Sequence, residues 1–213
     1  DLGPRQERLD TYKELFYLHP SVFTPDKQVL RDCGFNPDEK YILVRFVAWN
    51  ASHDIGKHGL DDEGKIRLVK RLERYGRVYV SAEGDVPEEL RPRLLKTPYE
   101  LIHHVLAFAQ LVFSEGATMA SEAAVLGTHA LYVNTIVSGS TREQSERFHL
   151  MDCFNEGEDR YERAAARAEE LLATPGLKEI GLEKQKKLLS EKVDINGYYM
   201  AEMDRLAKAG RKG

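Results

Sequence analysis

Apolar residues along the chain follow two alternating spacings. The run Tyr41–Val47 is apolar throughout except for Arg45, which is typical of a strand buried on both faces of a parallel sheet. Over Asp61–Tyr75 the apolar residues recur at helical spacing among charges until Gly76, and a second strand pattern covers Arg77–Ala82. Together these segments predict one β-α-β unit.

The alternation of helix and strand patterns continues toward the carboxyl terminus. In chain order it predicts a helix over Tyr99–Gln110, a strand over Leu111–Ser114, a helix over Thr118–Leu126 and a strand over Ala130–Thr135. We therefore expect an α/β fold, a Rossmann-like parallel sheet with helices on both faces. The stretch from Ser138 to Ser145 is rich in Ser, Gly and Thr, which predicts a mobile loop at a strand's carboxyl end.

Composition changes at both ends of this core and divides the chain into three parts. Residues 1–40 form an amino-terminal segment with a short helix over Asp26–Cys33, and residues 41–157 form the nucleotide-binding core. Residues 158–213 are almost entirely helix-forming and are expected to pack on the flank of the sheet, with helices over Ala164–Leu172, Leu182–Val193 and Tyr198–Ala209.

Charge and cysteine usage exclude several classes of function. The 213 residues carry a formal net charge of −4, without the basic stripe typical of proteins that bind nucleic acid. The two cysteines are far apart, and no apolar run reaches the roughly 18 residues that span a bilayer. We expect a cytoplasmic protein with no membrane span. The chain opens without an initiator Met, which favours part of a longer protein, and a homodimer stays open.

The turn Ser114–Gly127, SEGATMASEAAVLG, carries the clearest candidate chemistry. It follows a predicted strand and opens a helix, and ligands of open α/β sheets bind at this edge, where a helix amino terminus presents free N–H groups. Gly116 could adopt a positive φ and let a phosphate approach the backbone, while the small Ala117 keeps the path open. Ser114 or Thr118 could donate a hydroxyl or cap the helix.

Further along the same helix, Glu122 could accept hydrogen bonds from ribose hydroxyls. Met119 belongs to the predicted contact segment, although an apolar residue of an amphipathic helix is core by default. A turn with only a structural role explains the same pattern equally well.

With this turn in view, the chain resembles the carboxyl-terminal half of the DUF354 family. That family is of GT-B type and is related to UDP-N-acetylglucosamine 2-epimerases and nucleotide-sugar glycosyltransferases. The similar segments are YKELFYLHPSVFTPD, YILVRF, ASHDIGKHGL, the central block IHHVLAFAQLVFSEGATMASEAAVLGT, and SEKVDINGYYM. They span nearly the whole chain, and the central block is the most specific.

The resemblance implies a two-domain protein in which this half binds the nucleotide of a UDP-sugar-like ligand, with no further cofactor. An amino-terminal Rossmann-like half, absent from this chain, would hold the reacting sugar or the acceptor. By position, Ser114, Gly116, Ala117 and Thr118 match the diphosphate-facing turn of the relatives, and Glu122 matches their ribose-binding carboxylate. The complete protein would be a glycosyltransferase or a sugar-nucleotide epimerase, or a nucleotide-binding or scaffold module without turnover.

Two features depart from the family pattern. The epimerases have a Ser-Gly-Gly type turn, whereas Glu115 here precedes Gly116, and its carboxylate would repel a diphosphate unless it points away or pairs with a cation. Its role is left open. Of the epimerases' His-Arg-Arg-Glu-Asn-like segment only His53 has a counterpart, which makes it a weak catalytic candidate.

Isolated charged and polar residues allow further interpretations. His53, Asp54 and His58 suggest a metal-dependent hydrolase, but such enzymes need ligands on additional helices, so we expect no metal site. Of His103 and His104, one is expected to face the core and the other the surface. Arg45 must find a partner within its apolar strand, either in a buried ion pair or toward a ligand cleft.

Overall fold

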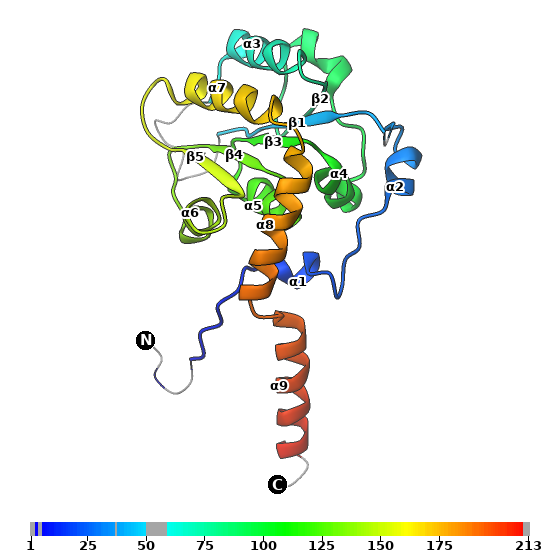
Figure 1. Ribbon diagram of the computed structural model, residues 1–213, viewed down its shortest axis with the longest axis vertical. Coiled ribbons are helices and arrows are strands. Elements are labelled where there is room, and N and C mark those ends of the chain that lie inside the picture. Colours follow the sequence, from blue (N-terminus) through cyan, green and yellow to red (C-terminus); the bar gives the residue numbers. More distant parts are fainter. Residues whose placement is uncertain (1–2, 4–5, 37, 50–58, 211–213) are drawn as a thin grey trace.

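The computed structural model describes residue 3 and residues 6–36, 38–49 and 59–210. At its centre lies one parallel sheet of five strands in the order β2-β1-β3-β4-β5 (Figure 1). The strands are β1 (Tyr41–Phe46), β2 (Arg77–Ala82), β3 (Leu111–Ser114), β4 (Ala130–Val133) and β5 (Met151–Phe154). The expected α/β fold is therefore confirmed.

The strand order reverses direction between β1 and β3. From β1 the chain passes outward to β2 on one side, whereas β3, β4 and β5 follow one another on the other side. Arg45 of β1 aligns with Ser114 of β3, so both strands reach the same edge of the sheet together. In open α/β sheets such a reversal leaves a crevice beyond the carboxyl ends of the two strands, where ligands bind.

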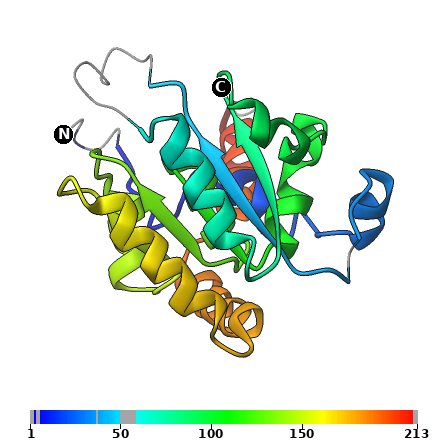
Figure 2. The ribbon, with the colours of Figure 1, turned by 90° about the horizontal axis from the view of Figure 1, so that it is seen from above.

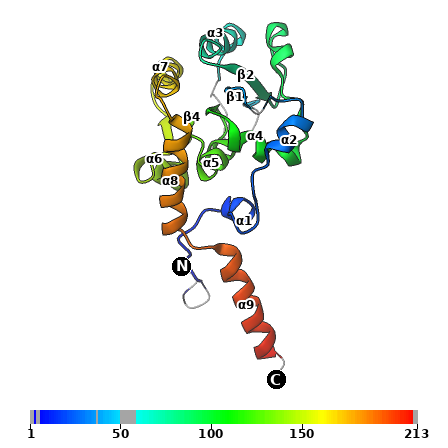
Figure 3. The ribbon, with the colours of Figure 1, turned by 45° about the vertical axis from the view of Figure 1, so that its right-hand side comes forward.

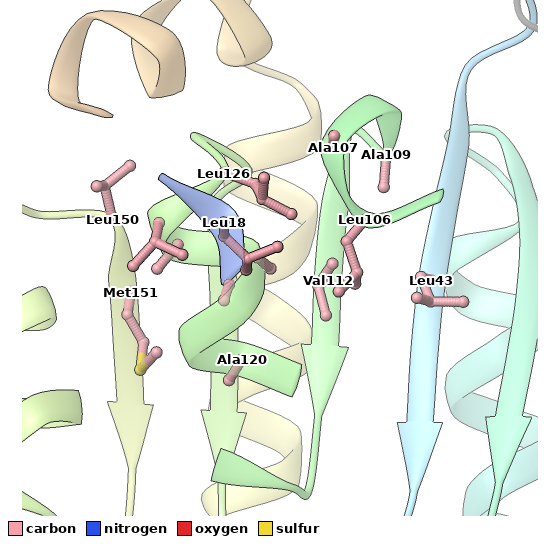
Figure 4. Packing of buried hydrophobic residues seen from close by; sticks show 14 of the residues in the cluster. Leu18, Leu43, Leu106, Ala107, Ala109, Val112, Ala120, Leu126, Leu150 and Met151 are labelled. Atoms are coloured by element: carbon pink, nitrogen blue, oxygen red, sulfur yellow. The ribbon is translucent and has the colours of Figure 1, made fainter. Parts of the chain in front are cut away.

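Helices cover both faces of the sheet (Figure 2). One face packs against α3 (Asp62–Leu72) and α7 (Arg160–Leu172), and the other against α4 (Ile102–Phe108) and α5 (Ala117–Val125). Alternate residues of β1 enter the two cores: Ile42 and Val44 on the first face, Leu43 on the second. Figure 4 shows part of the second core, with Leu43 on β1, Val112 on β3 and Ala120 on α5.

The remaining helices frame this core. Short helices α1 (Leu15–Leu18) and α2 (Lys27–Asp32) precede the sheet, and the 3-10 turns η3 (Glu88–Arg93) and η4 (Tyr99–Leu101) lie between β2 and α4. Helix α8 (Leu177–Glu191) packs against α5, whereas α9 (Ile195–Gly210) extends away from the body of the molecule (Figures 1 and 3). No described helix is long and apolar enough to cross a membrane.

One expectation about the carboxyl-terminal part of the sheet was wrong, and one strand was not predicted. The stretch from Ser138 to Ser145 is not a loop but most of a helix, α6 (Gly139–Glu146). A capping box starts this helix, because the side chains of Ser138 and Thr141 each accept a hydrogen bond from the other residue's backbone N–H. The strand β5, which the pattern did not predict, then completes the sheet.

Candidate functional site

The amino terminus of α5 lies at the carboxyl end of β3, next to the reversal of strand order. Gly116 is the N-cap residue, and no side chain caps the helix there. The first N–H groups of a helix have no acceptor within the helix, and together with its dipole they create an anion site. The residues that carry these groups, Ala117, Thr118 and Met119, are half-buried to exposed.

The local contacts of the turn differ from two expectations. Gly116 has φ −98°, so the positive φ that the sequence suggested is wrong, and the backbone conformation does not require glycine here. The Ser114 hydroxyl accepts the Gly116 N–H at 3.0 Å and donates to the Gly116 carbonyl at 2.8 Å. These two hydrogen bonds close the turn, and the Ser114 side chain is fully buried. Neither Ser114 nor the exposed Thr118 caps α5.

The side chain of Glu115 points into the protein. It is fully buried, and its Oε2 accepts the Val47 backbone N–H at 2.9 Å and the Trp49 indole N–H at 3.2 Å, while Tyr161 donates to Oε1 at 2.6 Å. Burial and this carboxylate raise the pKa of Tyr161, which keeps its hydroxyl a donor. Three donors thus balance the Glu115 charge, which is how a buried carboxylate is tolerated.

The Glu115 backbone ties neighbouring strands together at the same edge. Its N–H donates to the Arg45 carbonyl at 3.0 Å, and its carbonyl accepts from Asn134 at 2.8 Å. Asn155 in turn donates to the Asn134 carbonyl at 2.6 Å. Sequence reasoning did not find Asn134, Asn155 or Tyr161, because residues distant along the chain make these contacts.

Glu122 lies in the middle of α5 and its side chain is 12% exposed. Its Oε1 accepts the Tyr17 hydroxyl at 3.0 Å and lies 3.2 Å from His103 Nε2. Desolvation and this carboxylate raise the pKa of Tyr17. The expectation that one of His103 and His104 faces the core was wrong, because both are half-buried, and His104 accepts the Asp26 N–H at 3.0 Å.

Arg45, the one charged residue of the apolar strand β1, has polar partners on the neighbouring segment. Its guanidinium forms an ion pair with Glu83 and donates to the Ser81 hydroxyl at 2.8 Å, with 16% of the side chain exposed. Arg45 therefore forms an ion pair, as in the first of the two alternatives, but the pair is not buried, because the Glu83 side chain is 47% exposed. The catalytic candidate His53, with Asp54 and His58, lies outside the described residues. Among the described residues, no cluster of His, Cys, Asp and Glu could hold a metal ion.

A cavity of about 280 Å³ lies at the carboxyl ends of β1 and β2. Val47, Trp49 and Lys65 line it, together with Asp85. Val47 also borders the turn, since a methyl group added at Gly116 would lie 3.4 Å from its Cγ1. The cavity and the α5 amino terminus are therefore neighbours. A larger cavity, of about 670 Å³, is lined by residues at the amino ends of the strands, far from this site.

No protein-family model matches the chain, and no curated protein matches it. Solved structures with the same fold do exist. The glycotransferase of kitacinnamycin has a TM-score of 0.52 at 13% identity, covering 87% of this chain and 46% of the other. The calicheamicin glycosyltransferase CalG4 has a TM-score of 0.50 at 18% identity, covering 78% and 42%.

A third similar structure is Os79 from O. sativa, determined in complex with UDP and deoxynivalenol-3-glucoside. Its TM-score is 0.52 at 14% identity, and the match covers 83% of this chain and 42% of the other. This chain therefore spans less than half the length of these solved structures. Its five-stranded parallel sheet with flanking helices is the fold of the carboxyl-terminal domain of GT-B glycosyltransferases.

Proposed function

We propose that this chain is the nucleotide-sugar-binding half of a GT-B type glycosyltransferase or sugar-nucleotide epimerase, and that its ligand is a nucleoside diphosphate sugar such as a UDP-sugar. The observation that carries the proposal is the uncapped amino terminus of α5 at the reversal of strand order, within a fold shared with GT-B glycosyltransferases. The diphosphate would accept hydrogen bonds from the backbone N–H groups of Ala117, Thr118 and Met119.

The orientation of Glu115 removes the main electrostatic objection to a diphosphate at this turn. Its carboxylate is directed toward Val47, Trp49 and Tyr161, where three donors hold it. The Glu115 carboxylate is therefore not directed at the amino terminus of α5. Lys65, which is 19% exposed, lines the neighbouring cavity at the same edge of the sheet, where its ammonium lies 3.6 Å from Asp62 Oδ1.

Glu122 would bind the ribose hydroxyls. Tyr17 and His103 both contact its Oε1, which fixes the rotamer of the side chain, and neither contact uses Oε2. A carboxylate held in place by two neighbours loses little conformational entropy when it binds a ligand. The exposed Thr118, one turn earlier on α5, lies between this carboxylate and the helix amino terminus.

The reacting sugar and the acceptor would lie mainly against an amino-terminal Rossmann-like half. Under the DUF354 resemblance that half also supplies most of the catalytic groups, so the isolated chain should bind nucleotide without turning it over. Assay of the complete protein with a panel of sugar nucleotides would separate transfer, epimerisation and a binding module without turnover.

A thermal-shift titration of this chain with UDP tests the proposal. We expect UDP to raise the Tm of the wild type, since a ligand that binds only the folded state stabilises it. Glu122→Ala should abolish this shift. Tyr17→Phe is the matched control, because it removes one hydrogen bond to Glu122 but leaves the carboxylate, and it should retain most of the shift.

A wild-type chain whose Tm does not respond to any nucleoside diphosphate would contradict the proposal. So would a Glu122→Ala chain that keeps the full shift. If both variants lose it equally, the ribose assignment to Glu122 is wrong, and the Tyr17 side of α5 contributes to the site in another way.

A further inference from the structure

The cavity of about 670 Å³ lies at the edge of the sheet opposite the proposed nucleotide site. Lys40, just before β1, and Gln110, just before β3, mark this edge as the amino ends of the strands. Figure 4 shows Ala107 and Leu126 toward the amino ends of the strands, with Leu18 of α1 in front of α5. A volume of this size is typical of sites for small organic ligands.

The walls of this cavity are mostly apolar. Leu18, Phe23, Phe108, Leu126 and Leu182 line it, and α1, α2, α4, α5 and α8 or the segments beside them contribute these side chains. The segment between α1 and α2 lines the cavity with a proline near each end, Pro20 and Pro25.

Three ammonium groups also line the cavity, those of Lys27, Lys40 and Lys178. None of the three has an ion pair within the part of the chain that the structure describes. Lys27 Nζ lies 6.0 Å from the centroid of the Phe108 ring, and Lys178 Nζ donates to the Gly127 carbonyl at 3.3 Å and to the Thr128 hydroxyl. These contacts place positive charge beside apolar surface.

Two carboxylates line the same cavity and weaken its positive field. They are Asp38 and Glu39, and Glu39 Oε2 forms an ion pair with Arg77 Nη1 at 3.9 Å. Burial lowers the pKa of Lys178 to about 7, and the nearby Glu179 offsets this only in part. An acidic ligand group would supply the counter-charge that Lys178 lacks.

We propose that this cavity binds a small amphipathic anion, a molecule with an aliphatic or aromatic body and one carboxylate head group, free in solution. The body would fill the apolar walls, and the head group would pair with Lys178 and with Lys27 or Lys40. This site is separate from the nucleotide site, because it lies at the other edge of the sheet and none of its lining residues lies within residues 116–119 at the amino terminus of α5.

Titration of this chain with the fluorescent probe dansylaminoundecanoate at pH 7 tests the proposal. We expect saturable binding that decanoate displaces and that decanol, which lacks the charge, displaces at least tenfold less well. Lys178→Met should raise the Kd about tenfold or more, the effect of losing a hydrogen bond to a charged group. Saturating UDP should leave the Kd unchanged.

Leu182→Glu is a second variant, because Leu182 is 39% exposed and a carboxylate there should fold normally while repelling the anion. Lys186→Met is the matched control: it removes a lysine that is 71% exposed from the same helix, away from the cavity. The proposal is overturned if the wild type shows no saturable binding, if Lys178→Met and Leu182→Glu bind like Lys186→Met, if decanol competes as well as decanoate, or if UDP displaces the probe.

Discussion

Replacing Gly116 with Asp should stabilise the protein while abolishing nucleotide binding. Gly116 occupies the N-cap position of α5 with φ −98° and ψ 125°, the extended conformation in which an Asp side chain accepts from the N–H two or three residues ahead. The residue has room for a side chain, because the nearest atom to an added Cβ is Val47 Cγ1 at 3.4 Å, an ordinary contact.

Both effects can be estimated from this geometry. An Asp cap is worth a few tenths of a kcal/mol more than a Gly cap, and a negative charge at a helix amino terminus adds about 0.3–1 kcal/mol. In a chain of this length a gain of about 1 kcal/mol raises Tm by roughly 2–4 °C. Toward a phosphate about 4 Å away, the same carboxylate adds a repulsion of about 4 kcal/mol near a protein surface, which weakens binding roughly a thousandfold.

Thermal unfolding of wild type, Gly116→Asp and Gly116→Asn, each with and without UDP, measures both quantities. Asn caps the helix without a charge, so it should keep only the part of the rise in Tm that comes from the cap, a few tenths of a kcal/mol, and lose much less nucleotide affinity. The reasoning would be refuted if Gly116→Asp gained stability and still responded to UDP like the wild type. In that case the diphosphate does not bind at the amino terminus of α5.

Two further predictions concern carboxylates with several hydrogen-bond donors, the buried Glu115 and the half-buried Asp152. Glu115→Ala should lower the free energy of unfolding by about 3–5 kcal/mol, because it leaves three donors without an acceptor. Glu115→Gln should lower it by only about 1–2 kcal/mol, because the amide can accept two of these bonds and donate to the Tyr161 oxygen. Urea unfolding measures both losses, and equal losses would contradict this account. Burial would raise the pKa of Asp152, but hydrogen bonds from His129 and Arg167 lower it overall, so its stabilising contribution is present above about pH 4 and disappears as pH falls through the folded-state pKa. The stability difference between wild type and Asp152→Asn should therefore shrink below pH 4, and a difference that is constant between pH 3 and pH 7 would show that this pair does not matter.

The central strands could be predicted because their chemistry is local. Tyr41–Phe46 and Leu111–Ser114 are buried on both faces, so runs that are apolar except for Arg45 and Ser114 identify them. The edge strand β5 gives no such signal: it has four residues, and only Met151 is buried. Helix α6 lacks an apolar stripe as well, since its buried residues are Thr141 and Gln144, and its start depends on a capping box whose composition is that of a loop.

The candidate site was predictable only as far as its backbone. A glycine after a strand and before a helix indicates an anion site, and the structure has the helix terminus there without a cap. The direction of the Glu115 side chain could not be read from the sequence, because its side-chain partners lie 46 to 68 residues away along the chain. Which way a charge points depends on tertiary contacts that no local pattern encodes.

Glu115 nevertheless ties the proposed site to the rest of the fold. Because its carboxylate holds the Val47 backbone, and the Val47 side chain borders Gly116, the spacing between the β1 carboxyl end and the α5 amino terminus depends on one buried hydrogen-bond network. Tyr161 extends this network to α7, on the opposite face of the sheet. The residue whose charge seemed to forbid a phosphate is therefore better understood as the support that keeps the backbone donors of the turn in position.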